Sequence, residues 1–239
     1  MIQLFNRYFH PLSHHIKARE HYLANVRLAD VFYPLVKQPE LDFSTLASDY
    51  DYLVVDLETT GLDSEVDRIL SIGWVTLSAE SIDMTSAHHY YVNSRSQIKA
   101  ETAIINHITP QMLEEGISIH DAMNTFFEAA HGKILVAHGC MVESNFINRY
   151  LSKSFGLNAF PLTWLDTLCI EKKMAKAINH HEEIDVSLSA TRQRYQLPEY
   201  FAHNALTDAV ATAELLLAQK KRIASHKTVT LSQLYKLSH

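Results

Sequence analysis

The sequence predicts an α/β domain built on a mixed sheet. Three segments rich in β-branched and aromatic residues come first, and helical segments then alternate with short apolar strands. This order is typical of layered α/β domains in which helices cover a sheet of mixed strand direction. The chain has 239 residues, of which 47% are hydrophobic, which is enough for one large domain with an appendage.

Turn and cap signals delimit the expected elements between residues 51 and 225, the predicted main domain. The strands are expected at 52–57, 69–77, 87–92, 134–137 and 162–165, the third of these being the end of a strand that follows a turn near Ser81. The helices are expected at 111–115, 119–130, 143–155, 166–178, 187–195 and 205–224. Suitable N-caps and helix stops are Thr109, Ser118, Asp166, Gly116, Gly132 and Gly156.

The two ends of the chain have a different pattern. Residues 1–50 show roughly helical spacing of apolar side chains and are expected to form an N-terminal helical extension. Residues 226–239 are expected to be a tail that ends in a short helix capped by Thr230.

The composition limits the function. A net charge of −6 argues against a large duplex-binding surface, but it allows an enzyme that holds a few nucleotides at a metal site, where the cations add positive charge. No apolar run approaches the ~20 residues that span a bilayer. The first residues lack a secretory signal, so a cytoplasmic protein without a membrane partner is expected. Cys140 and Cys169 form no CxxC pair and are expected to be free thiols.

Asp56 and Glu58 are the most informative residues of the chain. They follow the short apolar run Tyr52–Val55, which predicts a buried strand. Side chains two positions apart on a strand point to the same face, so both carboxylates are expected to project together from the strand end. Because like charges repel and a buried unpaired charge is costly, a divalent cation such as Mg²⁺ or Mn²⁺ is the simplest compensation.

Two further segments place candidate acids at helix starts. Glu143 lies between a predicted strand and a predicted helix, shortly after His138. Asp208 lies early in the long predicted helix, and His203 comes just before that helix. Ligands of open α/β sheets gather outside the strand ends, where such loops and helix starts meet. Both segments are therefore candidates for the same site as the strand-end pair.

The three segments together resemble the motifs of the DEDDh family of 3′→5′ exonucleases, which includes the proofreading epsilon subunit of bacterial DNA polymerase III. The first family motif, D-x-E-T-T/S-G, matches Asp56–Gly61 throughout. The third motif, H-x-A-x-x-D, matches the segment His203–Asp208. The second, H-N-x-x-F-D, is kept at His138 but has Glu143 where the family has aspartate. The resemblance covers residues from about 51 to 225 and implies an RNase H-like fold.

The resemblance also implies a two-metal site for Mg²⁺ or Mn²⁺. Asp56 would bridge the two cations, Glu58 and Asp208 would complete the first position, and Glu143 would serve the second. His203 would be the general base, since the ordinary pKa of an imidazole suits proton transfer from water.

Substrate contacts follow from the same resemblance. The residues expected to contact substrate are Thr59, Gly61, Leu62 and His138. For Leu62, an apolar wedge against the terminal base and simple packing of its loop are equally good interpretations. For His138, a buried side chain bonded to the backbone is the preferred alternative. Asp166 is expected to be an N-cap, and it is the reserve candidate for the fourth acid if Glu143 is not.

The expected function is removal of nucleotides from the 3′ end of single-stranded DNA in proofreading or repair, with a polymerase or sliding clamp as a candidate partner. Gln233–Leu237 faintly resembles a clamp-binding peptide, although a packed C-terminal helix is the preferred interpretation. An RNA- or oligonucleotide-trimming exoribonuclease of the same family is the first alternative. A polymerase-associated module that has lost activity through the Glu143 replacement is the second. A haloacid-dehalogenase-like phosphatase would need a downstream lysine and a late acidic pair, and no such pair occurs in clear strand-end context.

Overall fold

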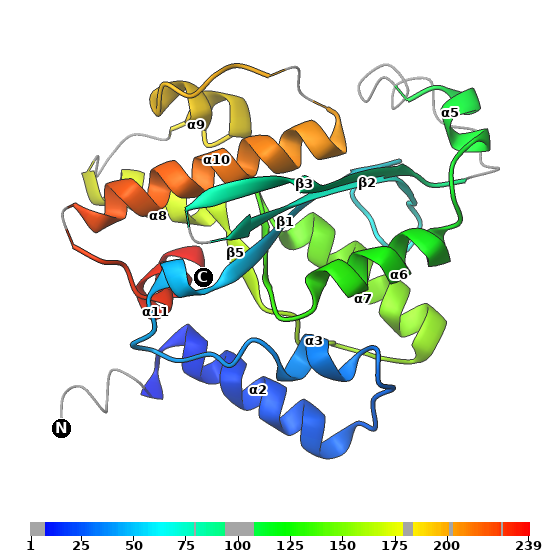
Figure 1. The fold of residues 1–239 in the computed structure, drawn as a ribbon, viewed down its shortest axis with the longest axis horizontal. Helices are drawn as coiled ribbons and strands as arrows, with labels where there is room; N and C mark the ends of the chain where they lie inside the picture. Colours follow the sequence, from blue (N-terminus) through cyan, green and yellow to red (C-terminus); the bar gives the residue numbers. More distant parts are fainter. Residues whose placement is uncertain (1–7, 79, 94–107, 179–183, 201–202, 226) are drawn as a thin grey trace.

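Five strands form one mixed sheet in the order β3-β2-β1-β4-β5 (Figure 1). A computed structural model describes residues 8–78, 80–93, 108–178, 184–200, 203–225 and 227–239. The strands are β1 (Asp51–Thr59), β2 (Ile69–Ser78), β3 (Ser81–Tyr91), β4 (Ile134–Ala137) and β5 (Trp164–Asp166). β1 pairs antiparallel with β2 and parallel with β4, so it joins the two halves of the sheet. The predicted five-stranded mixed sheet is confirmed.

Helices cover both faces of this sheet. The helices after β3 are α5 (Pro110–Glu114), α6 (Ile119–Ala130), α7 (Met141–Phe155), α8 (Thr167–Ile178), α9 (Leu188–Arg194), α10 (Ala205–Ala224) and α11 (Leu231–Ser238). Side chains of α6 and α7 form one core with Leu53 and Val55 of β1. Side chains of α8, α10 and α11 form a second core with Tyr52 and Val54, which point to the opposite face. β1 is buried on both faces, as its continuous apolar run predicts.

The observed boundaries differ from the predicted ones mainly at element ends. The helix at 119–130 and the strand at 134–137 have the predicted bounds. β1 continues past the predicted end at residue 57, because its pairing with β2 extends to Thr59 across a bulge. β5 is Trp164–Asp166 instead of 162–165, because its ladder with β4 begins at Trp164.

The N-terminal segment supplies side chains to both cores. Its helices are α2 (Pro11–Asn25) and α3 (Tyr33–Lys37), and a 3₁₀ turn, η1 (Ala47–Asp49), precedes β1. Leu12 and Val36 are fully buried, one in each core. Arg19 is also buried and donates from Nε to the Val36 carbonyl at 2.5 Å. The first 50 residues are thus packed into the sheet domain.

The C-terminal tail packs into the second core, beside Leu12 of the N-terminal segment. Thr230 caps α11, as predicted, and Leu234 is fully buried. Leu231 N donates to the carbonyl of Thr45 at 3.0 Å, which ties the tail to the segment that leads into β1. Within the described ranges, no helix has both the length and the apolar character of a membrane span.

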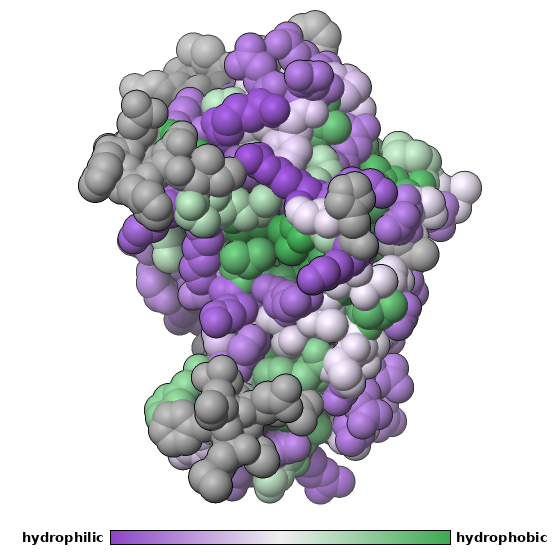
Figure 2. Space-filling model, turned by 90° about the vertical axis from the view of Figure 1, so that its left-hand side faces the viewer, coloured by the Kyte–Doolittle hydropathy of each residue, from purple (hydrophilic) through white to green (hydrophobic). Residues whose placement is uncertain are grey.

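Basic residues gather where α10 ends. Lys221 and Arg222 lie in its last turn, where positive charge offsets the negative end of the helix dipole. Together with Lys227, these two residues line a surface hollow that has a volume of about 650 Å³. On this side of the molecule, hydrophilic residues surround a smaller hydrophobic area (Figure 2).

His15 gives the packing of the N-terminal segment a pH dependence. Burial lowers its pKa to about 4, and the charges of Arg19 and His239 add to the effect. Between about pH 4 and 6.5 the unfolded chain binds a proton at His15 that the folded protein excludes, so the free energy of unfolding falls as the pH falls through this window. The free energy of unfolding, measured in urea, should fall between pH 7 and pH 4.5. We expect this fall to be smaller by roughly 1–3 kcal/mol in His15→Gln than in the wild type.

The matched control is His14→Gln, because His14 is the exposed neighbour in the same helix. Its unfolding free energy should follow that of the wild type at both pH values. Equal acid sensitivity of the wild type and His15→Gln would contradict the assignment.

Candidate active site and metal centre

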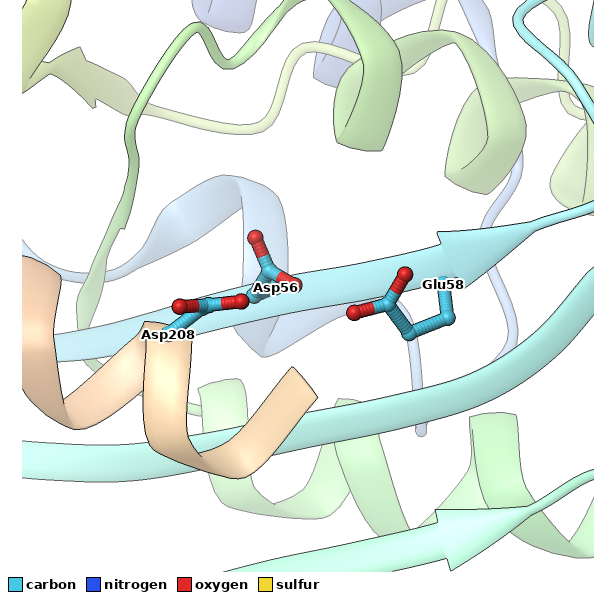
Figure 3. A group of neighbouring side chains, drawn as sticks. All are labelled: Asp56, Glu58 and Asp208. Carbon is cyan, nitrogen blue, oxygen red and sulfur yellow. The ribbon is translucent and has the colours of Figure 1, made fainter. Parts of the chain in front are cut away.

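The site begins at the C-terminal end of β1. Asp56 and Glu58 project from the same face of this strand, as their spacing predicts (Figure 3). Their partners on β2 are Gly73, which lies opposite Asp56, and Ser71, which lies opposite Glu58. The acids therefore stand over a glycine and a small hydroxyl side chain, which leaves room above β2 for another element.

That element is the first turn of α10. A Cβ atom added to Gly73 would lie 2.2 Å from the backbone N of Leu206 and 2.4 Å from the carbonyl C of Ala205. Only glycine allows a backbone to approach a strand this closely. Asn204 caps the helix by accepting a hydrogen bond from Thr207 N at 3.1 Å. The cap and the contact at Gly73 together fix where α10 begins.

Asp208, in the first turn of α10, completes a cluster of three carboxylates. One oxygen of each of Asp56, Glu58 and Asp208 lies within 4.8 Å of the others (Figure 3). The cluster joins side chains that are about 150 residues apart in the sequence. The structure thus brings together three of the four predicted acids.

Burial and mutual repulsion make these carboxyls hold protons. The pKa of Asp56 is raised well above its usual range by burial and then by the charges of Glu143, Asp208 and Glu58. Burial and the Asp208 charge raise the pKa of Glu58 to about 7. Burial also raises the pKa of Asp208, although a hydrogen bond from His203 N opposes the shift. The protons belong to the group as a whole, because its members titrate together.

The donor set fits a hard divalent cation. Carboxylate oxygens are the ligands that Mg²⁺ and Mn²⁺ prefer, and the three acids lie on two rigid elements, β1 and α10. A bound cation would replace the protons that the raised pKa values reveal. The composition of the site therefore supports a metal centre.

Glu143 lies in the first turn of α7, outside the close group of three. It is 5% exposed, and its Oε2 has no hydrogen-bond partner among the residues that the structure describes. Burial, followed by the charges of Asp166 and Glu58, raises its pKa to about 8. Its charge contributes to the raised pKa of Asp56, which couples Glu143 to the cluster electrostatically. A buried carboxylate oxygen without a partner is a candidate ligand for a second cation.

Asp166 has a structural role. Its Oδ1 accepts hydrogen bonds from the backbone N of Leu168 at 2.9 Å and of Gly139 at 2.9 Å. Its Oδ2 accepts one from Cys140 N at 3.1 Å. The predicted N-cap of α8 is confirmed, and the same carboxylate fixes the turn that leads into α7 and Glu143.

His138 is held between two segments instead of facing the acids. Its Nδ1 is 2.9 Å from Thr167 Oγ1, and its Nε2 is 2.9 Å from the carbonyl oxygen of Val186. Burial lowers its pKa, which keeps the ring neutral. Both nitrogens are engaged, so the alternative of a buried structural histidine accounts for this residue.

His203 lies at the entrance to α10 with its side chain exposed. Its backbone is in the left-handed region, with φ 68°, which is uncommon for a residue other than glycine. Its N–H donates to Asp208 Oδ2 at 2.8 Å. The predicted base is thus anchored through its backbone to an acid of the cluster, and the residue is exposed to solvent.

The loop after β1 presents the remaining predicted contacts. Thr59 Oγ1 donates to the carbonyl of Gly61 at 2.6 Å, which tightens the turn. Leu62 is 77% exposed, so it is available to a ligand and does not pack its own loop. Asp67 stabilises the loop by accepting a hydrogen bond from Thr60 Oγ1 at 2.8 Å.

Sequence reasoning missed two residues that shape the site, Gly73 and Asn204. Gly73 could have been found because a glycine inside a strand pattern often marks a place where another backbone approaches closely. Asparagine directly before a helix is a good N-cap, which was the signal for Asn204.

The fold is of the RNase H-like class, and it places the acid cluster at the end of β1 and the start of α10. The chain belongs to the RNase_T exonuclease family, whose model matches residues 53–216. This membership confirms the resemblance to the DEDDh family of 3′→5′ exonucleases and, at the level of the family, an exonuclease enzyme.

Individual relatives agree with this family. The DNA polymerase III PolC-type protein of Thermotoga maritima is 29% identical over 189 residues, which are 79% of this chain and 13% of that protein. The 3′-5′ exonuclease DinG of Staphylococcus haemolyticus is 29% identical over 187 residues, which are 78% of this chain and 20% of that protein. The chain thus spans 13–20% of the length of these curated relatives.

A solved structure of exonuclease X in complex with 5′ overhanging duplex DNA has the same fold. Its TM-score to this chain is 0.58 at 21% identity, and the match covers 79% of this chain and 99% of that one.

Asp56→Asn should separate stability from metal binding. Without metal at pH 8, the variant should be about 1–3 kcal/mol more stable than the wild type, because it removes a buried carboxyl that must either hold a proton or carry a repelled charge at this pH. Saturating Mn²⁺ should raise the unfolding midpoint of the wild type by roughly 5–10 °C and leave that of the variant nearly unchanged. Differential scanning fluorimetry with and without Mn²⁺ measures both effects.

The control for this prediction is Asp83→Asn, which neutralises an exposed acid of β3 outside the cluster. It should respond to Mn²⁺ as the wild type does. An equal Mn²⁺ response of Asp56→Asn and the wild type would show that the cluster does not hold the ion.

Gly73→Ala should displace the start of α10. The added methyl group collides with the backbone of α10, so we expect a loss of roughly 1–3 kcal/mol of stability and at least tenfold weaker Mn²⁺ binding by calorimetry.

Gly156→Ala is the control. Gly156 has φ +68° and open space around its Cβ position, so the substitution strains the backbone away from the site. It should lose stability but keep Mn²⁺ affinity, and unchanged affinity in Gly73→Ala would refute the role of the contact.

Proposed function

We propose that the chain is a divalent-metal-dependent 3′→5′ exonuclease that releases nucleotides from the 3′ end of single-stranded DNA. The observation behind the proposal is the cluster of Asp56, Glu58 and Asp208, which combines family motifs with a geometry suited to hard cations. Direction and substrate are supported by the relatives of similar sequence, one named as a 3′-5′ exonuclease and one as a DNA polymerase III. Proofreading or repair is the corresponding role.

In this proposal the four acids hold two cations, Mg²⁺ or Mn²⁺. Asp56 would contribute to both positions, Glu58 and Asp208 would complete the first, and Glu143 would serve the second. The assignment of Glu143 is supported by its buried Oε2, which has no hydrogen-bond partner among the residues that the structure describes. Bound cations would act as Lewis acids that offset the negative charge of the phosphate and of its leaving oxygen.

The chain's own groups perform the remaining steps. His203 takes a proton from the attacking water, for which an exposed imidazole next to Asp208 is well placed. Leu62, which is exposed early in the loop after β1, contacts the terminal base, and the backbone at Thr59–Gly61 contacts the same nucleotide. His138 acts indirectly, because its ring holds the strand-to-helix turn before Glu143.

We propose a DNA polymerase as the partner of this chain. The PolC-type relative, in which the matched region is a small part of a polymerase, supports it. The C-terminal segment Gln233–Leu237 is a weak candidate for clamp binding, because Leu234 is buried in the core of the domain.

Degradation of a 5′-labelled oligonucleotide tests the function. With Mg²⁺ or Mn²⁺, the wild type should shorten single-stranded DNA stepwise from the 3′ end, and a chelator should stop the reaction. Asp208→Asn and His203→Ala should lower the rate by roughly 10³-fold or more and 10²-fold or more, respectively. Asp83→Asn should keep wild-type activity.

The other outcomes discriminate between functions. Faster shortening of the matched RNA would assign an exoribonuclease. Release of internal fragments would exclude an exonuclease. Mn²⁺ binding without any hydrolysis would favour the inactive binding module.

A further inference from the structure

Arg192 of α9 is a buried arginine that joins three parts of the chain. It is 4% exposed. Its Nη1 donates to the carbonyl of Ala211 in α10 at 2.5 Å. Its Nη2 donates to the carbonyl of Pro198 at 2.8 Å and to Glu214 Oε2 at 2.7 Å. The ring of Tyr200 lies against the guanidinium, whose carbon is 4.8 Å from the ring centroid. These contacts clamp the segment after α9 onto α10.

The clamped segment leads to His203. In Figure 1 the described segment that follows α9 runs along α10 toward the end of α10 that holds its first turn. Tyr200 is held by Arg192 and by the bond from its hydroxyl to Glu214 Oε1 at 2.8 Å. His203 is held by the bond from its N–H to Asp208 Oδ2. The three-residue step between them spans at most about 11 Å, so a fixed Tyr200 restricts where His203 can lie.

We propose that Arg192 is a positioning residue that fixes the segment 198–200 and thereby places His203 beside Asp208. The inference rests on the proposed function, in which His203 takes the proton from water. The left-handed backbone of His203, with φ 68°, is a conformation that persists where surrounding contacts hold it. Arg192 contributes from outside the acid cluster by holding Pro198 and Tyr200, in the segment that leads to His203.

The proposal requires arginine in particular. The guanidinium binds two carbonyls and a carboxylate at once through its planar fork, and it stacks on Tyr200. A lysine keeps the charge but has a single nitrogen, so it cannot hold both segments. Arg194, two residues further along α9, bonds to the carbonyl of Asp185 at 2.6 Å and pairs with Glu171. It supports α9 through other partners and is therefore the matched control.

A double-mutant cycle tests whether Arg192 acts through His203. Arg192→Lys should lower kcat for single-stranded DNA by roughly tenfold or more, with KM within about twofold of the wild type. In a His203→Ala background, Arg192→Lys should change kcat by less than about twofold, because the group it positions is absent. Arg194→Lys should leave kcat unchanged in both backgrounds. An equal fold-loss from Arg192→Lys with and without His203 would overturn the proposal.

A second measurement does not depend on activity. In the metal-free protein, Arg192→Lys should shift the NMR signal of the His203 amide and speed its hydrogen exchange, because the bond to Asp208 is loosened. Arg194→Lys should leave that amide unaltered. An unchanged amide in Arg192→Lys would overturn the proposal even if activity falls. An inactive wild type would refute the proposed function, and the amide would still decide the positioning role.

Tyr200→Phe provides a milder variant if Arg192→Lys does not fold. It removes one hydroxyl from a side chain that is 42% exposed, and with it the bond to Glu214. We expect the same pattern at smaller size: a several-fold loss of kcat that disappears in the His203→Ala background, and a shifted His203 amide. Wild-type kcat together with an unshifted amide would count against the proposal.

Discussion

The contact between the first turn of α10 and Gly73 is the constraint on which the site depends. β1 and β2 are paired so that the glycine lies opposite Asp56, and any side chain there would collide with the backbone of α10. The absence of a Cβ atom lets Asp208 share one space with the two acids of β1. The sheet register, the helix cap and the glycine therefore act together, and a change in any of them would separate the carboxylates.

The electrostatic cost of this arrangement explains much of the surrounding packing. Burial raises the pKa of each clustered acid, so the metal-free protein folds only if these groups take up protons or if other contacts offset their repulsion. Both faces of β1 are covered by apolar side chains, and the N-terminal and C-terminal segments complete the two cores. A tightly packed frame of this kind can keep like charges close together without a counterion.

Local signals predicted most of the fold and three of the acids. Period, caps and turn residues are encoded in neighbouring positions, so α6, β4 and α10 were placed with their observed bounds. The motif spacing predicted Asp56, Glu58 and Asp208 together because each ends or starts a regular element. What the sequence could not provide depends on distant packing: the contact at Gly73, the burial of Leu12 and Val36, and the partners of His138. None of these has a local pattern that identifies its partner.

Fixed and adjustable parts of the site are supported differently. Asp56, Glu58 and Asp208 stand on a strand and a helix, whose backbone hydrogen bonds define their positions. Glu143 has a longer side chain than the family's aspartate, yet the turn before it is fixed by Asp166, so its carboxylate can reach toward the cluster from a defined helix start. His203 has no regular element beneath it. In its proposed role as the base, His203 would approach water and then release a proton, which a loop allows, but a loop needs an external anchor to return to one position. The buried guanidinium of Arg192, which binds Pro198 and α10 together, is the anchor that we propose.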